Sequence, residues 1–328
     1  MKKILFILSI SSLVLLSSCN KDKNNPTPPP PPPPPVPSDT LATGWKKINF
    51  IDTSNLIDIF FINNTGFAVG SNIYKSSDGG ENWSQLTSPS GLSPNSFENI
   101  GMGKEMNAVF VNPPNKLVST HNGGTNLTVT TLSTSSLTDV FFVDSTVAYA
   151  VGKSVWKTID GGDNWTKLYD FTASAGYNSL FFTNQQIGWV IKQEGVYKTI
   201  NGGVDWQLVN TDTINLGYGG AIFFLNSDTG YISNSYSIEK TVNGGASWNK
   251  VFTCTYTTSV YHDIHFVSEN VGYVTDGPRI FKTTDGGNTW TKVVALASSS
   301  NYLSELHFTD ANHGWACGEK GTILKYSQ

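Results

Sequence analysis

The sequence contains almost no arginine. Arg279 is the single arginine among 328 residues, and Asp, Glu, Lys and Arg together make up 14% of the chain, well below the usual share of about a quarter. Proteins that hold phosphate, sulfate or a carboxylate at several points normally use a group of arginines. The formal net charge is −4, so no basic face is available for a nucleic acid. These shortages exclude arginine-based anion recognition and predict that nucleic acid is not bound.

Long apolar runs are also scarce. The apolar run Ile4–Leu16 is broken only by serines and is shorter than the roughly 20 residues that cross a bilayer. It follows a basic start and ends at Leu16-Ser17-Ser18-Cys19, which is typical of a secretory signal and resembles a bacterial lipobox. We expect residues 1–18 to be a lipoprotein signal peptide and Cys19 to carry the lipid. An ordinary cleaved signal with a chance cysteine is the alternative.

The next segment, 19–44, is rich in proline. Its eight consecutive prolines, Pro28–Pro35, favour a polyproline II rod of about 25 Å. We interpret the segment as a lipidated cysteine and a tether that holds the protein to a membrane, although proline runs can also be ligands for aromatic grooves. Lys21-Asp22 weakly resembles a surface-export signal of lipoproteins. The expected location is therefore the bacterial outer membrane, with exposure at the cell surface as one option.

From residue 45 onward the sequence is a repeat array. A turn made of Asp or Asn and two glycines recurs, with Trp five residues after the Asp or Asn in five of its six copies. A period near 40 with four short apolar stretches is typical of a four-stranded propeller blade. The copies begin at Asp78, Asn122, Asp160, Asn201, Asn243 and Asp285, and their tryptophans are Trp83, Trp165, Trp206, Trp248 and Trp290.

The two ends of the array give the number of blades. A seventh repeat starts at Glu305 and lacks a fourth strand, whereas Gly44-Trp45-Lys46-Lys47-Ile48 copies the fourth strand at 164–168. An N-terminal strand that completed the last blade would remove the exposed sheet edge. We therefore predict an all-β, seven-bladed β-propeller of four-stranded blades over residues 45–328, closed by that strand.

The turn motif resembles the Asp-box, or BNR, repeat. In that family the box is structural and lies on the face opposite the functional one, so all the box residues named above are assigned structural roles here. The fuller pattern, Gly-aromatic followed by Lys-Thr-x-Asp-Gly-Gly-x-x-Trp, is similar to that of photosystem II stability/assembly factor-like propellers. That resemblance implies a seven-bladed, membrane-associated propeller that holds a client protein. The arginine patch associated with those proteins has no counterpart in this chain.

Candidate binding residues lie at the opposite, upper face. An aromatic residue stands near the end of five links between blades: Phe97, Tyr177, Tyr218, Tyr261 and Tyr302. Acids occupy one repeat position just beyond the links, at Asp58, Asp139, Asp263 and Glu305, and His265 and His307 replace Phe two residues further on. Such a cluster could hold a divalent metal or perform acid–base chemistry. Alternatively, the acids bond to neighbouring backbone and the histidines are half-buried polar aromatics.

Three functions compete at this stage. Sialidases share the turn motif but hold the substrate carboxylate with a group of arginines, so the single arginine excludes that activity. A glycan-active hydrolase with a carboxylate–histidine site at the channel mouth is the alternative to our main hypothesis. We favour a non-catalytic, membrane-tethered binding or scaffold propeller, a monomer without cofactor or metal, whose upper face binds a protein or a glycan.

Overall fold

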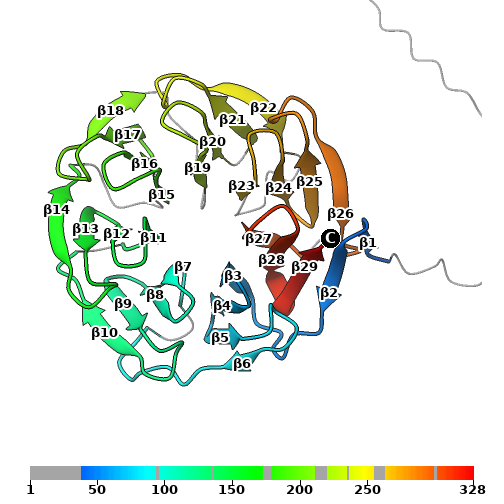
Figure 1. Cartoon of the computed structure of the whole chain (residues 1–328), viewed down its shortest axis with the longest axis horizontal. Coiled ribbons are helices and arrows are strands. Elements are labelled where there is room, and N and C mark those ends of the chain that lie inside the picture. Colours follow the sequence, from blue (N-terminus) through cyan, green and yellow to red (C-terminus); the bar gives the residue numbers. More distant parts are fainter. Residues whose placement is uncertain are drawn as a thin grey trace, which may run out of the picture. The chain divides into compact units, whose positions relative to one another are not determined.

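The computed structural model describes residues 38–93, 96–134, 136–172, 179–210, 220–234, 236–254, 263–298 and 301–328. Seven antiparallel sheets stand around a central axis in chain order (Figure 1). The prediction of an all-β, seven-bladed propeller is confirmed. In the described residues no helix is long and apolar enough to pass through a bilayer.

Each blade begins with its innermost strand and ends with its outermost one. Blade 1 contains β3 (Leu56–Ile62), β4 (Thr65–Gly70), β5 (Ile73–Ser76) and β6 (Ser84–Gln85). Blade 2 contains β7 (Asn99–Lys104), β8 (Asn107–Asn112), β9 (Lys116–Thr120) and β10 (Thr128–Thr131). Blade 3 contains β11 (Asp139–Phe142), β12 (Ala148–Val151), β13 (Ser154–Thr158) and β14 (Thr166–Asp170).

The remaining blades follow the same order. Blade 4 contains β15 (Ser179–Phe182), β16 (Gly188–Lys192), β17 (Gly195–Thr199) and β18 (Gln207–Asn210). Blade 5 contains β19 (Ile222–Phe224), β20 (Gly230–Ser233), β21 (Ser237–Thr241) and β22 (Asn249–Thr253). Blade 6 contains β23 (Ile264–Phe266), β24 (Gly272–Asp276), β25 (Arg279–Thr283) and β26 (Thr291–Ala295). Blade 7 contains β27 (Leu303–Phe308), β28 (His313–Gly318), the 3-10 turn η1 (Glu319–Gly321) and β29 (Thr322–Ser327).

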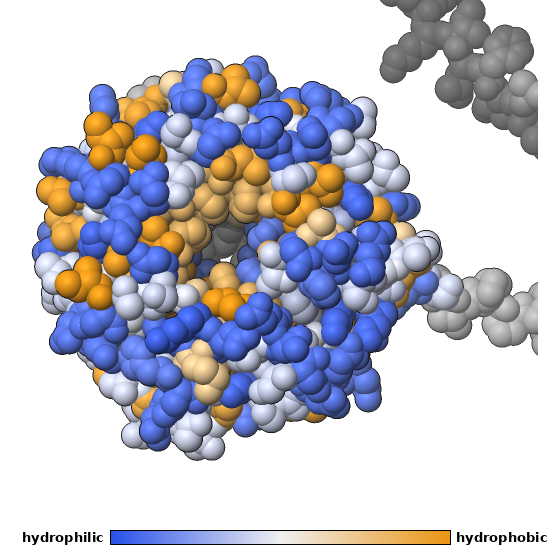
Figure 2. All heavy atoms as spheres, in the orientation of Figure 1, coloured by the Kyte–Doolittle hydropathy of each residue, from blue (hydrophilic) through white to orange (hydrophobic). Residues whose placement is uncertain are grey.

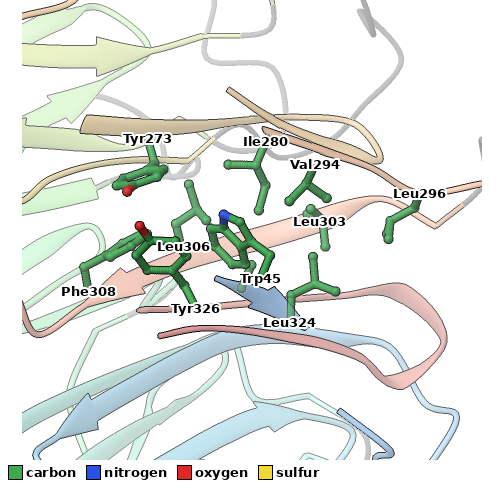
Figure 3. Close-up of a cluster of buried hydrophobic side chains, with 11 residues drawn as sticks. Trp45, Tyr273, Ile280, Val294, Leu296, Leu303, Leu306, Phe308, Leu324 and Tyr326 are labelled. Atoms are coloured by element: carbon green, nitrogen blue, oxygen red, sulfur yellow. The ribbon is translucent and has the colours of Figure 1, made fainter. Parts of the chain in front are cut away.

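The ring is closed by the N-terminal strand β2 (Trp45–Ile48), which pairs with β29 and completes blade 7. Trp45 lies edge-on to Phe308 at 6.1 Å, just as Trp83 lies edge-on to Phe61 at 5.7 Å in blade 1. Figure 3 shows Trp45 inside the cluster of apolar side chains between blades 6 and 7. The predicted closure is therefore confirmed, and the N-terminal tryptophan replaces the box tryptophan that blade 7 lacks.

A short strand precedes the closing strand. β1 (Thr40–Leu41) pairs with β26 and adds a fifth strand to blade 6. Asp39 fixes its start, because the Asp39 carboxylate accepts the backbone N–H of Ala297 at 2.8 Å. That hydrogen bond lowers the pKa of Asp39. The segment predicted as a tether thus includes two residues that belong to a sheet.

Aromatic stacking joins neighbouring blades. The aromatic residue of a second strand lies flat on a phenylalanine of the next blade, as Trp189 does on Phe224 with ring centres 3.6 Å apart. A glycine precedes this aromatic residue because the blade's own phenylalanine fills the space beside it. A Cβ atom at Gly188 would lie 2.5 Å from the ring of Phe182. These interlocked rings form much of the core between blades.

The Asp-box turns lie between the third and fourth strands. In blade 1 the carboxylate of Asp78 accepts the backbone N–H groups of Glu81 and Asn82, each at 3.0 Å. These bonds, the one from Asn82 above all, lower the pKa of Asp78 to about 2. The indole N–H of Trp83 donates to the carbonyl of Gly80 at 3.0 Å. All six turns share the bond to the fourth residue after the Asp or Asn, at 2.8 to 3.0 Å.

Each box turn therefore has local partners for its key side chain, as the structural assignment requires. The turns also contact the bend between the first two strands, since the N–H of Gly79 donates to the carbonyl of Asn64 at 2.9 Å. The boxes consequently lie at the end of the blades opposite the links that join one blade to the next.

Candidate functional site

The innermost strands enclose an axial channel of about 310 Å³. Figure 2 shows its opening at the centre of the molecule, with apolar side chains along much of the rim. One position of each innermost strand faces this space, two residues after the acid position identified in the sequence. We call the side chains at this position the aromatic collar: Phe60, Phe141, Phe181, Phe223, His265 and His307.

The rings of the collar touch one another from blade to blade. Centre-to-centre distances run 4.9, 5.2, 5.3, 5.6 and 4.0 Å from Phe141 in blade 3 round to Phe60 in blade 1. Blade 2 contributes no ring because Gly101 occupies its position. A Cβ atom there would lie 2.9 Å from the ring of Phe142, so a side chain of blade 3 leaves no room for one. The collar is therefore continuous from blade 3 through blade 7 to blade 1 and is interrupted at blade 2.

The acid position forms a second layer of the channel wall. We call Asp58, Asp139, Asp263 and Glu305 the acid tier. The carboxylate of Asp58 accepts the backbone N–H of Ile100 at 2.7 Å, and Asp139 and Asp263 accept those of Leu180 and Leu306 at 2.7 and 2.9 Å. Each of these bonds reaches the next blade, so the carboxylates fasten adjacent blades together.

Blade 2 shows that this fastening needs no charge. Asn99 stands at the acid position there, and its side-chain oxygen accepts the N–H of Val140 at 2.9 Å. The geometry thus agrees with backbone bonding by the repeat-position acids. Among the described residues, no group of three or more His, Cys, Asp and Glu side chains is placed to hold a metal ion.

Burial changes the protonation of the acid tier. It raises the pKa of Asp139 to about 7, because a buried carboxylate loses its hydration. Burial and, secondarily, the charges of nearby acids raise the pKa of Asp58 to about 8. Burial and the adjacent Asp263, with which it shares a hydrogen bond, raise the pKa of Glu305 well above its ordinary value. Burial raises the pKa of Asp263 less, to about 6, so the tier is only partly protonated near neutral pH.

Burial has the opposite effect on the histidines. It lowers the pKa of His265 to about 3 and that of His307 to about 4. The Nε2 atom of His307 lies 2.9 Å from the carbonyl oxygen of Phe61 in blade 1, and a neutral imidazole can donate to it. Both imidazoles are therefore uncharged at neutral pH and serve as polar members of the collar.

Only two of the five predicted rim aromatics, Phe97 and Tyr302, lie among the described residues. Phe97 is 3% exposed and packs in the core between blades 1 and 2. Tyr302 is half-buried at the start of blade 7. Tyr177, Tyr218 and Tyr261, together with Cys19, lie outside the described residues. The collar phenylalanines were not predicted as site residues, although they share the repeat position of His265 and His307, two residues after the acid position, and alternate strand residues share a face.

Comparisons with known proteins agree with the repeat motif. A family model described as "Photosynthesis system II assembly factor YCF48" matches residues 247–327. The photosystem II assembly lipoprotein Ycf48 of Prochlorococcus marinus (strain MIT 9312) is 53% identical over 45 residues, which is 13% of this chain and 13% of the relative. The alignment thus covers only a small part of that relative's length. The resemblance to the photosystem II assembly-factor propellers is confirmed.

Solved structures extend the similarity over most of the chain. The structure of YCF48 bound to D1 peptide covers 90% of this chain and 100% of its own, with a TM-score of 0.70 and 18% identity. Virginiamycin B lyase from Staphylococcus aureus covers 87% and 99%, with a TM-score of 0.69 and 13% identity. At these identities the similarity shows the fold alone, and the fold serves both a peptide-bound protein and an enzyme.

The predicted outer-membrane location is wrong. The lipoprotein that this chain matches is named for the assembly of photosystem II, and the matching family model carries the same description. Photosystem II is a complex of photosynthetic membranes and not of an outer membrane. The weak export signal at Lys21-Asp22 was the basis of the prediction, and two residues carry too little information for it.

Proposed function

We propose that this chain is a non-catalytic propeller that binds a segment of a partner protein at the channel mouth. The observation that carries the proposal is the channel itself. It has a volume of about 310 Å³ and a collar of aromatic rings, while three of its four tier carboxylates are engaged in bonds between blades. A concave, mostly apolar site with a few polar groups is suited to binding.

The comparisons support a protein partner. One similar structure is a YCF48 with D1 peptide bound, and the matched relative is named as an assembly lipoprotein. We propose by extension that Cys19 carries a lipid and that residues 20–37 tether the propeller, which acts as a monomer. A glycan is the alternative ligand, because aromatic rings also bind sugars.

The separation of the carboxyl groups argues against the hydrolase alternative. Asp263 and Glu305 share a hydrogen bond, whereas the two carboxyl groups of a glycosidase stand about 5 Å or more apart, leaving room for the bond that is cleaved. In this arrangement the pair holds a proton between its members and leaves no space for a glycosidic oxygen.

Site-specific photo-crosslinking tests the proposal. A photoreactive phenylalanine analogue at Phe181 in the collar should crosslink a partner protein in the native host. The same analogue at Ile159, which is 71% exposed on a box turn, should not crosslink that partner. Crosslinking from the box turn alone would contradict the proposal, as would cleavage of an oligosaccharide that is lost in His265→Phe.

A further inference from the structure

The channel wall carries carboxyl groups without a cation to balance them. Five acids line it: Asp58, Glu98, Asp139, Asp263 and Glu305. Among the described residues that line the channel, none is Lys or Arg. Buried carboxyl groups are normally paired with a positive charge. Here burial raises the pKa values of the acids instead, so that they are only partly charged near neutral pH, and the wall can accept a cation from outside.

The aromatic collar faces the same space. Its rings stand two residues along the strand from the acid tier, a separation of about 7 Å. The half-buried rings of Phe141, Phe181 and Phe223 form one side of the channel, and His265 and His307 continue it uncharged. Aromatic ring faces attract cations, most strongly where water is excluded. A cation that enters the channel thus meets ring faces and carboxyl oxygens together.

We infer that the channel binds an organic cation, namely the guanidinium or ammonium group of an Arg or Lys side chain presented by the partner protein. This inference rests on the proposed function and names the chemistry that the channel selects. A volume of about 310 Å³ accommodates one long side chain and excludes a folded element. A metal ion fits less well, because phenyl rings supply no ligand atoms and the carboxyl groups are not grouped around a point.

Binding of the cation displaces a proton. A neutral carboxylic acid of the tier loses its proton to solvent, and the resulting carboxylate pairs with the incoming guanidinium. The titratable groups around the channel wall in the described residues are the five acids, the two imidazoles named above and the buried thiol of Cys317. Burial raises the pKa of Asp58 to about 8 and that of Asp139 to about 7, so ionisation becomes easier as the pH rises. Affinity should therefore increase with pH, by up to tenfold per unit for each proton released.

Isothermal titration calorimetry of the full chain in detergent tests the inference with two matched probes. n-Butylguanidinium carries the charge, and n-butylurea has nearly the same shape without it. We expect butylguanidinium to bind at least tenfold more tightly than butylurea, and at least tenfold more tightly at pH 8 than at pH 6. Titrations in two buffers of different ionisation enthalpy should show net proton release. Equal affinity for the two probes, or an affinity independent of pH, would overturn the inference.

Two variants locate the site, with a third as control. Asp58→Asn copies the residue that blade 2 carries naturally at this position, so it keeps the bond between blades. It should weaken butylguanidinium at least fivefold and leave butylurea unchanged. Phe181→Leu should weaken butylguanidinium through the loss of a ring face. Asp160→Asn, at a box turn, should change neither. Full affinity in Asp58→Asn and Phe181→Leu would place the cation elsewhere.

The two sets of experiments distinguish a wrong cation inference from a wrong proposed function. If butylguanidinium binds but no partner crosslinks from Phe181, the cation site stands and the binding function is wrong. If a partner crosslinks there and replacing its Arg and Lys residues leaves the complex unchanged, the function stands and the cation inference is wrong.

Discussion

Asp139→Asn should make the protein more stable at alkaline pH relative to the wild type. Asp139 is buried, and its pKa is raised from 3.8 to about 7. The folded state thus holds a proton that the unfolded chain gives up. A raised carboxyl pKa contributes stability below pH 4, and this contribution is lost as the pH rises toward 7. Asparagine keeps an oxygen acceptor for the N–H of Leu180, as Asn99 does for Val140, but cannot ionise.

The magnitude follows from the displacement of the pKa. Each unit of displacement corresponds to about 1.4 kcal/mol, and integration over the two titrations gives a relative gain of roughly 2 to 3 kcal/mol for the variant between pH 5 and pH 8. Urea unfolding of both proteins at the two pH values measures this gain. Subtracting the free energy of unfolding of the wild type from that of the variant at each pH removes the contribution of the other titrating groups.

A box variant provides the control. Asp160 has a pKa of about 2, so it stays ionised from pH 5 to pH 8, and three other boxes already carry Asn. The stability difference between Asp160→Asn and the wild type should therefore be the same at both pH values. If the difference for Asp139→Asn is equally constant, the carboxyl group is charged throughout and burial does not govern its titration.

Three further changes probe closure, protonation and anchoring. Trp45→Ala removes a buried aromatic side chain from the closing strand and should cost about 3–5 kcal/mol in urea unfolding; a loss below 1 kcal/mol would show that the strand does not close the ring. His307→Phe restores the residue of other blades. It should reduce the loss of stability that the wild type shows as the pH falls from 6.5 to about 4, the folded pKa of His307; an unchanged acid profile would contradict the burial of a neutral imidazole. Cys19→Ala should move the protein out of the detergent phase in a Triton X-114 partition, and persistent detergent partitioning would contradict lipidation.

The repeat pattern was enough to predict the blades because each box fixes its turn locally. The carboxylate of Asp78 accepts the N–H of Asn82, and the indole of Trp83 donates to Gly80. Because all these partners lie within a few residues, the local sequence is enough to predict the turn. The copy of the box strand at residues 44–48 likewise revealed the closure. β1 escaped prediction because two residues carry no periodicity, and the contacts that fix them, the pairing with β26 and the bond from Ala297 to Asp39, come from residues more than 250 positions away.

The site was harder to predict than the fold. Acids and histidines at equivalent repeat positions could be found by alignment, but whether Asp58 meets a metal, a substrate or the backbone N–H of Ile100 depends on the angle between blades. The same angle brings the collar rings into contact. No spacing within one repeat contains that information, since it arises only when seven sheets pack around an axis.

The closing strand has a consequence for the order of folding. β2 is synthesised before every complete blade, yet its partner β29 lies at the other end of the propeller. Contacts between residues so distant in the chain are slow to form. Blades 1 to 6 each contain four strands of their own and can assemble while β2 is still unpaired. Blade 7 has an exposed sheet edge until β2 pairs with β29. We therefore expect closure to be the last step of folding, and it depends on keeping β2 unpaired with other sheet edges until then.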